Sequence, residues 1–398
     1  MVIAGGVYYE LCSFPEWNAL YGSGGRAAAA LSAFDDIELH TFVPEEYEES
    51  VRIALAPFPV AINVYRSEVI YDFHYVHALA KPIYYTAPTR QVKSPPQQLR
   101  MAVKSEVALR FGFMEGDAVV EGEWVTYDPQ SPSPQRFSEN GSSATHLAYV
   151  LNESELAALY PDDDLDAAAR KLLKEESAEV ILIKRGVFGV RVVTRDRGAA
   201  SVPAYKTANV FKIGSGDVFS ASFAYHWGVK REDPFAAART ASQSAAWYCD
   251  TRSLPIPETE ILDALTPVSG GHARPIYLAG PFFTVGQRLL IEETRNILTR
   301  LGANVFSPYH DIGLGEPNVV APADIAAIER SSVILALAED LDLGTVFEIG
   351  YGTASNVPSI VQALRLPEHQ FSMVLGTENT VERDYATALY KAIWASLI

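Results

Sequence analysis

Short apolar runs alternate with charged, helix-like stretches over most of this chain, and this alternation restricts the possible folds more than any other feature. Val180-Ile181-Leu182-Ile183 is one apolar run, and it follows a charged helical stretch. Ser332 to Leu337 is another, with the composition of a strand that is buried on both faces. Strands that alternate with helices favour mostly parallel sheets covered by helices. The sequence therefore predicts an α/β protein.

The length of the chain and one irregular segment predict two domains. A chain of 398 residues is longer than one hydrophobic core usually organises. Residues 253–275 interrupt the alternation with four prolines, two adjacent glycines and one short helical stretch. We therefore expect a domain over residues 1–265, a linker over 266–275 and a second domain over 276–398.

The composition excludes several classes of protein. The net charge is −17 and no run of Lys or Arg occurs, which argues against a nucleic-acid partner. No apolar run approaches 18 residues, so no membrane partner is expected. Cys12 and Cys249 are the two cysteines, too few for a disulfide framework, and they fit a reducing cytoplasm. No Cys/His pattern has zinc spacing, so no metal held by the protein alone is predicted.

The C-terminal third has the pattern of a doubly wound sheet, in which ligands bind beyond the carboxyl ends of the strands. Tyr277, Ser307, Asp324 and Asp342 could all reach a pocket there from strands or flanking loops. The expected strands are 276–280, 304–307, 333–338, 358–363 and 372–375. The expected helices run from about 285 to 301, near Asp324, through Glu348 and from about 381.

Two segments of this third carry the residues for breaking a glycosidic bond. The strand that begins Ile276-Tyr277 runs into Gly280-Pro281-Phe282-Phe283, and the later stretch Asp342–Tyr351 contains Glu348. Together with Asp324 they offer three carboxylates and a tyrosine to one pocket, as glycosidic chemistry requires. Glu348 follows Gly344 closely and should lie in the first turns of a helix, whose dipole favours an ionised carboxylate. An ionised carboxylate can attack the sugar carbon and form a covalent ester.

These residue types and spacings, from Pro275 to Ile398, resemble the nucleoside 2-deoxyribosyltransferase family. The resemblance implies a flavodoxin-like domain that needs no cofactor and cleaves the N-glycosidic bond of a nucleoside. It makes Glu348 the nucleophile, Tyr277 the residue that holds Glu348, Asp324 the acid for the departing base and Asp342 a ligand of a sugar hydroxyl. The implied substrate contacts are Gly280, Phe282, Phe283, Ser307 and Ser372, and the two phenylalanines either flank the base or pack in the core.

The alternative is that these acids only cap helices or solvate a loop, as acids early in a helix often do. The family often carries an Asn before its Met, which it lends to the neighbouring subunit, whereas this chain has Phe371-Ser372-Met373. The resemblance implies a homo-oligomer. It leaves open the base, ribose or deoxyribose, nucleoside or monophosphate, and transfer or hydrolysis.

A second group of motifs lies before residue 265. At Val210–Tyr225 a strand enters a Gly-Ser-Gly turn that opens a helix, and backbone N–H groups at such a turn point at anions. Asp217 follows the turn, where a base could take a proton from a sugar hydroxyl. These residues resemble the second signature of the ribokinase-like (PfkB) carbohydrate and nucleoside kinases. Further matches are Gly22–Gly25, Asp128-Pro129, Asn152-x-x-Glu155 and Lys184–Gly189.

This resemblance implies a ribokinase-like N-terminal domain that uses ATP and Mg²⁺. It assigns Asp217 as the catalytic base. It assigns contacts with the nucleotide and its Mg²⁺ to Gly214, Ser215, Gly216, Asn152, Glu155, Gly186 and Gly189, and contacts with the sugar to Glu10, Gly24 and Gly25.

The kinase-like half departs from its family in the sugar pocket. Ala29 stands where an Asn is usual, and Glu10 where an Asp is usual. The stretch between Glu10 and Gly22 is short, which predicts a reduced lid over the sugar. Three functions stay open: glycosidic cleavage joined to a sugar or nucleoside kinase, a protein that is mainly a kinase, or a pseudokinase that serves the glycosidic domain. In each case the substrate is a small nucleoside, nucleotide or sugar.

Overall fold

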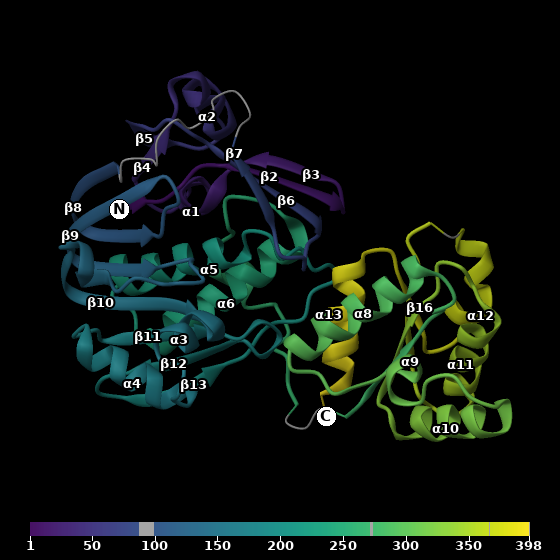
Figure 1. Cartoon of the computed structure of the whole chain (residues 1–398). Coiled ribbons are helices and arrows are strands. Elements are labelled where there is room, and N and C mark those ends of the chain that lie inside the picture. Colours follow the sequence, from purple (N-terminus) through teal and green to yellow (C-terminus); the bar gives the residue numbers. More distant parts are fainter. Residues whose placement is uncertain (87–98, 271–273, 366, 398) are drawn as a thin grey trace. The chain divides into compact units, whose positions relative to one another are not determined.

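The computed structural model describes residues 1–86, 99–270, 274–365 and 367–397 (Figure 1). The chain divides into two compact units. The N-terminal unit comprises Met1–Thr207 and Phe211–Pro267, and the C-terminal unit comprises Ala208–Val210 and Val268–Ile398. Of the expected linker, residues 271–273 lie outside the described residues.

A large sheet forms the centre of the N-terminal unit. Its middle strands pair in parallel, whereas β11, β12 and β13 pair antiparallel at one edge. Within the described residues it has nine strands, in the spatial order β13 (Gly198–Val202), β12 (Val190–Thr194), β11 (Val180–Lys184), β10 (Ser143–Asn152), β9 (Gly116–Asp128), β8 (Leu99–Phe111), β1 (Val2–Ala4), β4 (Ile37–Val43) and β5 (Val60–Arg66).

Apolar residues alternate along β10 between two hydrophobic clusters, because successive side chains point to opposite faces of a strand. Ala148 and Val150 pack with Phe219 and Phe223 of α5 in one cluster, and Tyr149 lies in the other. Helices therefore cover both faces, as in a doubly wound fold. They are α1 (Gly22–Leu31), α2 (Glu48–Leu55), α3 (Glu153–Leu159), α4 (Leu165–Glu175), α5 (Ser215–Phe223), α6 (Pro234–Thr251) and α7 (Thr259–Leu262), with a π-helical turn η4 (Ala224–Val229) after α5 and short 3-10 turns at η1 (Glu45–Tyr47), η2 (Phe137–Asn140) and η3 (Gly186–Phe188).

A smaller sheet stands beside the large one. We expected a reduced lid over the sugar because the stretch between Glu10 and Gly22 is short. In the structure the hairpin in this stretch, β2 and β3, is extended by two strands from later in the chain, which the expectation did not include. The order of the four described strands is β3 (Trp17–Leu20), β2 (Tyr9–Phe14), β6 (Tyr71–His77) and β7 (Ile83–Thr86).

The C-terminal unit is a parallel sheet between helices. Its described strands lie in the order β15 (Val305–Phe306), β14 (Ile276–Ala279), β16 (Val333–Leu337), β17 (Ser359–Gln362) and β18 (Thr380–Glu382). Its helices are α8 (Val285–Arg300), α9 (Pro308–Asp311), α10 (Pro317–Arg330), α11 (Leu343–Ala354), α12 (Ser372–Leu375) and α13 (Tyr385–Ser396), with a 3-10 turn η5 (Glu368–Phe371).

The expected strand at 372–375 is wrong. This segment is helix α12, and the fifth strand of the sheet is β18 instead. The side chains explain the difference, because a strand inside a parallel sheet needs cover on both faces. Phe371 is buried, whereas Met373 is 85% exposed. A short apolar run cannot be assigned to helix or strand from its periodicity alone. The α/β class expected for both units is confirmed.

Within the described residues, no helix is both long and apolar enough to cross a membrane.

Candidate functional site

Three of the expected catalytic residues meet beside β14. Tyr277 is fully buried on this inner strand, and its hydroxyl donates a hydrogen bond to Glu348 Oε1 over 2.7 Å. The same hydroxyl also interacts with the carboxyl group of Asp324, on α10. One tyrosine thus connects two carboxylates that are supplied by two different helices.

The environment of these carboxyls favours their protonated forms. Burial, with smaller contributions from the charges of Asp324 and Asp342, raises the pKa of Glu348 to about 7. The bond from Tyr277 acts in the opposite direction, because it stabilises the ionised form. Burial also raises the pKa of Asp324. The expectation that the helix dipole keeps Glu348 ionised therefore omitted the larger effect of burial.

Asp342 has the capping role that the sequence left open beside the role of sugar ligand. It is the N-cap of α11, and its Oδ1 accepts hydrogen bonds from the backbone N–H groups of Gly344 at 3.0 Å and Thr345 at 3.1 Å. Its Oδ2 is buried and has no hydrogen-bond partner among the described residues, and the same holds for Asp324 Oδ1. Two carboxylate oxygens near Glu348 are therefore available to a bound molecule.

Aromatic side chains lie on the segment that follows β14. Phe282 stacks on Phe283 with 5.4 Å between ring centroids, and it contacts Tyr309 at the same distance. Phe283 is 72% exposed. Arg288 lies 5.7 Å from the ring of Tyr309 and donates to the carbonyl of Phe282. Tyr309 and Arg288 were missed from the sequence, where only their proximity to Ser307 and Phe283 along the chain could have indicated them.

The other expected substrate contacts, Ser307, Gly280 and Ser372, contact residues other than Glu348. Ser307 is buried, and its hydroxyl is within 3.0 Å of His310 Nδ1. Gly280 packs tightly, because a Cβ atom there would lie 3.1 Å from Ile291. Ser372 is exposed and donates to the carbonyl of His369. Among the described residues, no hydrogen bond or ion pair joins Ser372 to Glu348.

The Gly-Ser-Gly turn of the N-terminal unit opens helix α5 as expected, but the expected strand before it is wrong, because residues 206–213 form no strand. Gly214 adopts φ of +81° at the N-cap of α5, which favours glycine, and Asp217 lies buried in the first turn of the helix. A Cβ atom on Gly214 would lie 2.1 Å from the side chain of Arg26. The turn therefore needs glycine both for its backbone and for the arginine above it.

Arg26 is a residue that the sequence analysis missed. It is fully buried on α1 and forms an ion pair with Asp217 Oδ2 over 2.8 Å. It also pairs with both carboxylate oxygens of Glu10, and its Nε donates to the hydroxyl of Tyr248 over 3.0 Å. The other oxygen of Asp217 accepts from Gln130 over 2.7 Å. Both oxygens of the expected base are thus bound, one of them by a cation.

A second buried ion pair lies on the other side of the turn. Lys184 Nζ lies 2.7 Å from Asp128 Oδ2 and 3.6 Å from the position that a Cβ atom on Gly216 would occupy. Because an ammonium group stands beside backbone N–H groups at a helix N-terminus, the turn could hold a phosphate.

The remaining kinase-type residues have structural roles in the fold. Asn152 and Glu155 bond to each other in the capping box that begins α3. Burial, with a smaller contribution from Asp128, raises the pKa of Glu155 to about 7. Gly24 lets α1 approach β1, since a Cβ atom there would lie 2.4 Å from the carbonyl oxygen of Gly5, and Gly25 follows it in the same turn. Gly186 and Gly189 bound the turn after β11.

Comparison with known proteins divides the chain in the same way. Residues 125–260 match the pfkB family carbohydrate kinase model, and residues 276–373 match the nucleoside 2-deoxyribosyltransferase model. The two family resemblances inferred from the sequence are thereby confirmed, and one chain matches both family models. A search of curated proteins found no match.

Several solved kinases are similar to this chain. A ribokinase from Thermotoga maritima is 15% identical, with 66% of this chain and 97% of that chain covered and a TM-score of 0.44. A fructokinase from Vibrio cholerae is 12% identical, with 66% of this chain and 98% of that chain covered and a TM-score of 0.49. Phosphofructokinase-2 from Escherichia coli is 13% identical, with 67% of this chain and 99% of that chain covered and a TM-score of 0.47. At these TM-scores the similarities carry no argument about activity.

Proposed function

We propose that the C-terminal unit cleaves or transfers at the N-glycosidic bond of a nucleoside or its monophosphate, through a covalent bond between the sugar and Glu348. The observation that carries this proposal is the 2.7 Å hydrogen bond from Tyr277 to Glu348, with Asp324 on the same hydroxyl. This arrangement fixes a carboxylate at the carboxyl end of a parallel sheet, where such folds bind their ligands.

In the first step the ionised carboxylate of Glu348 attacks C1′ of the sugar. The new C–O bond forms as the C1′–N bond breaks, and the electron pair of that bond leaves with the base. Asp324 donates a proton to the departing base, a role that its raised pKa supports. Tyr277 keeps Glu348 aligned by donating to the oxygen that does not attack.

In the second step a new acceptor attacks C1′ and releases Glu348. The acceptor is another base in transfer and water in hydrolysis, and Asp324 takes its proton in either case. Asp342 Oδ2, which has no partner among the described residues, is placed to accept a hydrogen bond from a sugar hydroxyl. Phe282 and Phe283 offer flat apolar surface to the base.

Mass spectrometry of the denatured protein tests this proposal. The protein is quenched in acid during turnover of a nucleoside and digested. We expect the mass of the sugar on the peptide that contains Glu348, and its absence from Glu348→Gln, whose amide is a poor nucleophile. Glu348→Ala should also abolish base release without unfolding the protein. Near-normal release by either variant would remove Glu348 from this role.

For the N-terminal unit, Arg26 favours a pseudokinase over an active sugar kinase. The guanidinium of Arg26 compensates the charge of Asp217, and Arg26 and Gln130 each occupy a lone pair on one of its two oxygens, which opposes its use as the base. The turn beside Lys184 still suits the phosphate of a nucleotide such as ATP, which would bring Mg²⁺ with it. We therefore propose a unit that holds a nucleotide without transferring its phosphate.

Calorimetry and a transfer assay with Mg-ATP test this second function. We expect ATP binding by the wild-type protein, but no phosphorylation across a panel of pentoses, hexoses and nucleosides. Phosphorylation that Asp217→Asn abolishes would refute the pseudokinase and restore the active kinase. If no nucleotide binds, only a structural role remains for this unit.

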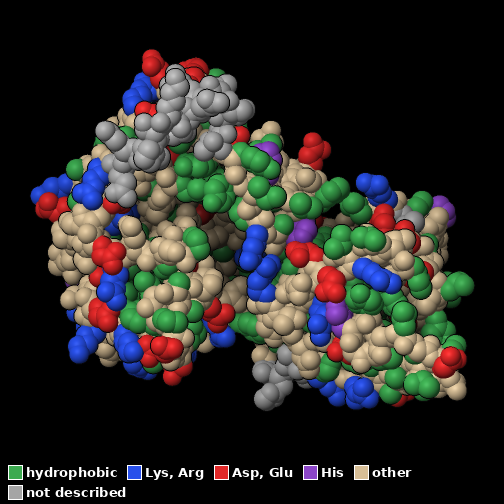
Figure 2. All heavy atoms as spheres, viewed as in Figure 1, with side chains coloured by type: hydrophobic (Ala, Val, Ile, Leu, Met, Phe, Trp, Pro, Cys, Tyr) green, Lys and Arg blue, Asp and Glu red, His purple; other side chains and the backbone are tan. Residues whose placement is uncertain are grey.

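We also propose that the C-terminal unit associates with a second copy of itself. Figure 2 shows hydrophobic side chains exposed over this unit. The exposed hydrophobic residues of this unit include Leu343, which is 89% exposed, Phe347 on the same helix as Glu348, and Met373. Apolar residues so close to a polar site suit an interface that completes the site. A partner copy would cover them and exclude water from Glu348.

A further inference from the structure

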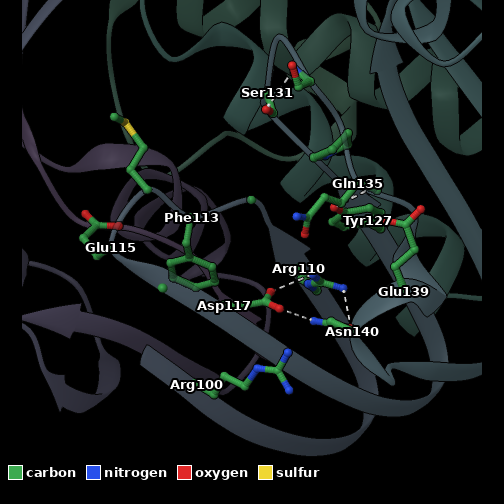
Figure 3. A pocket seen from close by; sticks show the side chains of 15 residues that line it. Arg100, Arg110, Phe113, Glu115, Asp117, Tyr127, Ser131, Gln135, Glu139 and Asn140 are labelled. Atoms are coloured by element: carbon green, nitrogen blue, oxygen red, sulfur yellow. Dashed lines mark hydrogen bonds and ion pairs between the residues drawn. The ribbon is translucent and has the colours of Figure 1, made fainter. Parts of the chain in front are cut away.

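The N-terminal unit contains a cavity of about 400 Å³ that none of the functions above uses (Figure 3). Its volume suits a single small molecule. None of the residues that line it belongs to the Arg26 ion-pair cluster or to the Gly-Ser-Gly turn. The residues that matter for its chemistry are Arg100, Arg110, Phe113, Glu115, Asp117 and Tyr127.

The cavity exists because two long strands bend. Four residues, 112–115, separate β8 from β9, although the two strands pair in parallel over their whole length. Parallel neighbours normally need a connection of about a dozen residues or more. A short connection is possible only if both strands bend back on themselves. The bend explains why Arg100 and Arg110, from opposite ends of β8, line the same cavity (Figure 3).

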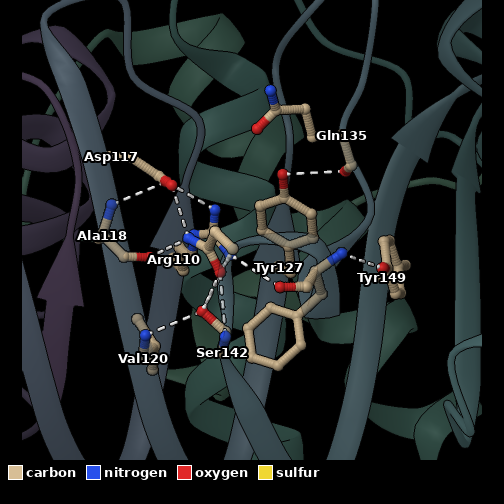
Figure 4. Close-up of polar contacts among 10 residues, drawn as sticks. Arg110, Asp117, Ala118, Val120, Tyr127, Gln135, Ser142 and Tyr149 are labelled. Atoms are coloured by element: carbon tan, nitrogen blue, oxygen red, sulfur yellow. Dashed lines mark hydrogen bonds and ion pairs between the residues drawn. The ribbon is translucent and has the colours of Figure 1, made fainter. Parts of the chain in front are cut away.

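Arg110 forms a fixed polar wall of this cavity (Figure 4). It is 2% exposed and forms an ion pair with Asp117 over 2.9 Å. Asn140 donates to the other oxygen of Asp117 over 2.7 Å, and the guanidinium lies 4.6 Å from the ring centroid of Tyr127. A buried ion pair seldom adds net stability to a fold, but it holds its polar atoms in one geometry.

Two residues that line the cavity each have a buried polar atom with no hydrogen-bond partner among the described residues. These atoms are Nε of Arg110, which is a donor, and Oε1 of Glu115, which is an acceptor. Glu115 is 5% exposed, and backbone N–H groups bind its carboxyl group. Most buried polar atoms in proteins are paired, so an unpaired donor and acceptor around one cavity indicate a ligand that supplies both.

The charges around the cavity restrict the chemistry of that ligand. Asp117 neutralises Arg110, and burial raises the pKa of Glu115 to about 7. Arg100 and Glu139, which also line the cavity, carry opposite charges. No net positive charge is left for a phosphate. A hydroxyl group both donates and accepts, as Arg110 and Glu115 require, and the rings of Phe113 and Tyr127 suit the apolar face of a sugar ring.

We propose that this cavity is a second, non-catalytic site for a neutral monosaccharide. Its hydroxyl groups bind Arg110 Nε and the Glu115 carboxyl, and its ring packs on Phe113 and Tyr127. The proposal concerns the N-terminal unit alone and does not depend on the chemistry at Glu348.

Calorimetry on the full chain tests the proposal with ribose, 2-deoxyribose, glucose and fructose. The affinity for each sugar is compared with the affinity for its monophosphate. The key variant is Ser133→Trp, which places a large ring in the cavity from an exposed lining residue. Ser201→Trp on the edge strand β13 is the matched control, because Ser201 is exposed and does not line the cavity. Asp217→Asn controls for binding near the Arg26 cluster.

We expect a neutral sugar to bind wild type, Ser201→Trp and Asp217→Asn, and not to bind Ser133→Trp. Phe113→Ala should weaken binding several-fold, which is the loss expected for one aromatic contact. This variant replaces Ser133→Trp in the test if Ser133→Trp does not fold. The proposal is overturned by folded wild-type protein that binds no neutral sugar, by binding that survives Ser133→Trp, or by tighter binding of the phosphate than of its neutral sugar.

Discussion

Replacing Tyr277 by Phe should shift the pH dependence of glycosidic cleavage without destroying the site. The substitution removes one hydroxyl group, which donates to Glu348 over 2.7 Å and also interacts with Asp324. The ring remains to fill its buried position on β14. Because the lost bond stabilises the ionised carboxylate, its removal raises the pKa of Glu348 above the value of about 7.

The size of the shift follows from the strength of that bond. A hydrogen bond to a charged group contributes about 1.5 to 3 kcal/mol. Since about 1.36 kcal/mol corresponds to one pH unit, the acidic limb of the rate profile should move up by about one to two pH units. Glu348 must be ionised to attack, so the variant loses most activity near neutral pH. It should recover towards the wild-type rate at about pH 9.

Base release from a nucleoside, measured as kcat/KM over a range of pH, checks this prediction, because kcat/KM reports groups of the free enzyme. Tyr351→Phe is the matched control. Tyr351 lies on the same helix as Glu348, but its hydroxyl donates over 2.7 Å to Glu329 instead. Its profile should match wild type. A Tyr277→Phe profile that loses activity equally at every pH would refute the reasoning, since Tyr277 would then only support the structure.

Three further outcomes are expected. Asp324→Asn should slow nucleosides with poor leaving bases more than those with good ones, and equal losses across a leaving-group series would show that Asp324 only positions substrate. Glu348→Gln should be more stable than wild type above pH 7, by up to about 3 kcal/mol in denaturant unfolding. The folded-state pKa of Glu348 is raised from 4.5 to about 7, so the native state loses stability as pH rises through that window and the variant does not. Light scattering should find an oligomer that Phe347→Glu disrupts, and a fully active wild-type monomer would contradict this.

The sequence predicted that Tyr277, Asp324 and Glu348 lie together because these residues belong to regular elements. Tyr277 lies on an apolar strand, and Glu348 lies on a helix that begins just after an acidic loop. The parallel order brings the carboxyl ends of such strands to one edge, so three separate segments could be placed together before any contact was known. The pKa of Glu348 could not be predicted in this way, because it depends on burial and on the charges of Asp324 and Asp342.

Features that depend on distant partners were missed. In the sequence Arg26 is one charge in a run of glycines and alanines, and its partners Asp217 and Tyr248 lie 191 and 222 residues away. No local pattern marks such a residue as buried. The bend in β8 was missed for a related reason, since it follows from pairing with β9 rather than from the composition of either strand.

The two units place a buried carboxylate in the first or second turn of a helix, and the group that contacts it decides what it can do. Glu348 receives a neutral hydroxyl, which orients one oxygen and leaves the charge of the carboxylate uncompensated. Asp217 receives a guanidinium that already binds Glu10, so its charge is shared in a closed ion-pair cluster. The charge of Glu348 is thus left for an attack on the sugar, whereas the charge of Asp217 is compensated by Arg26. This difference supports our two proposals, that Glu348 acts as a nucleophile and that the N-terminal unit does not transfer phosphate.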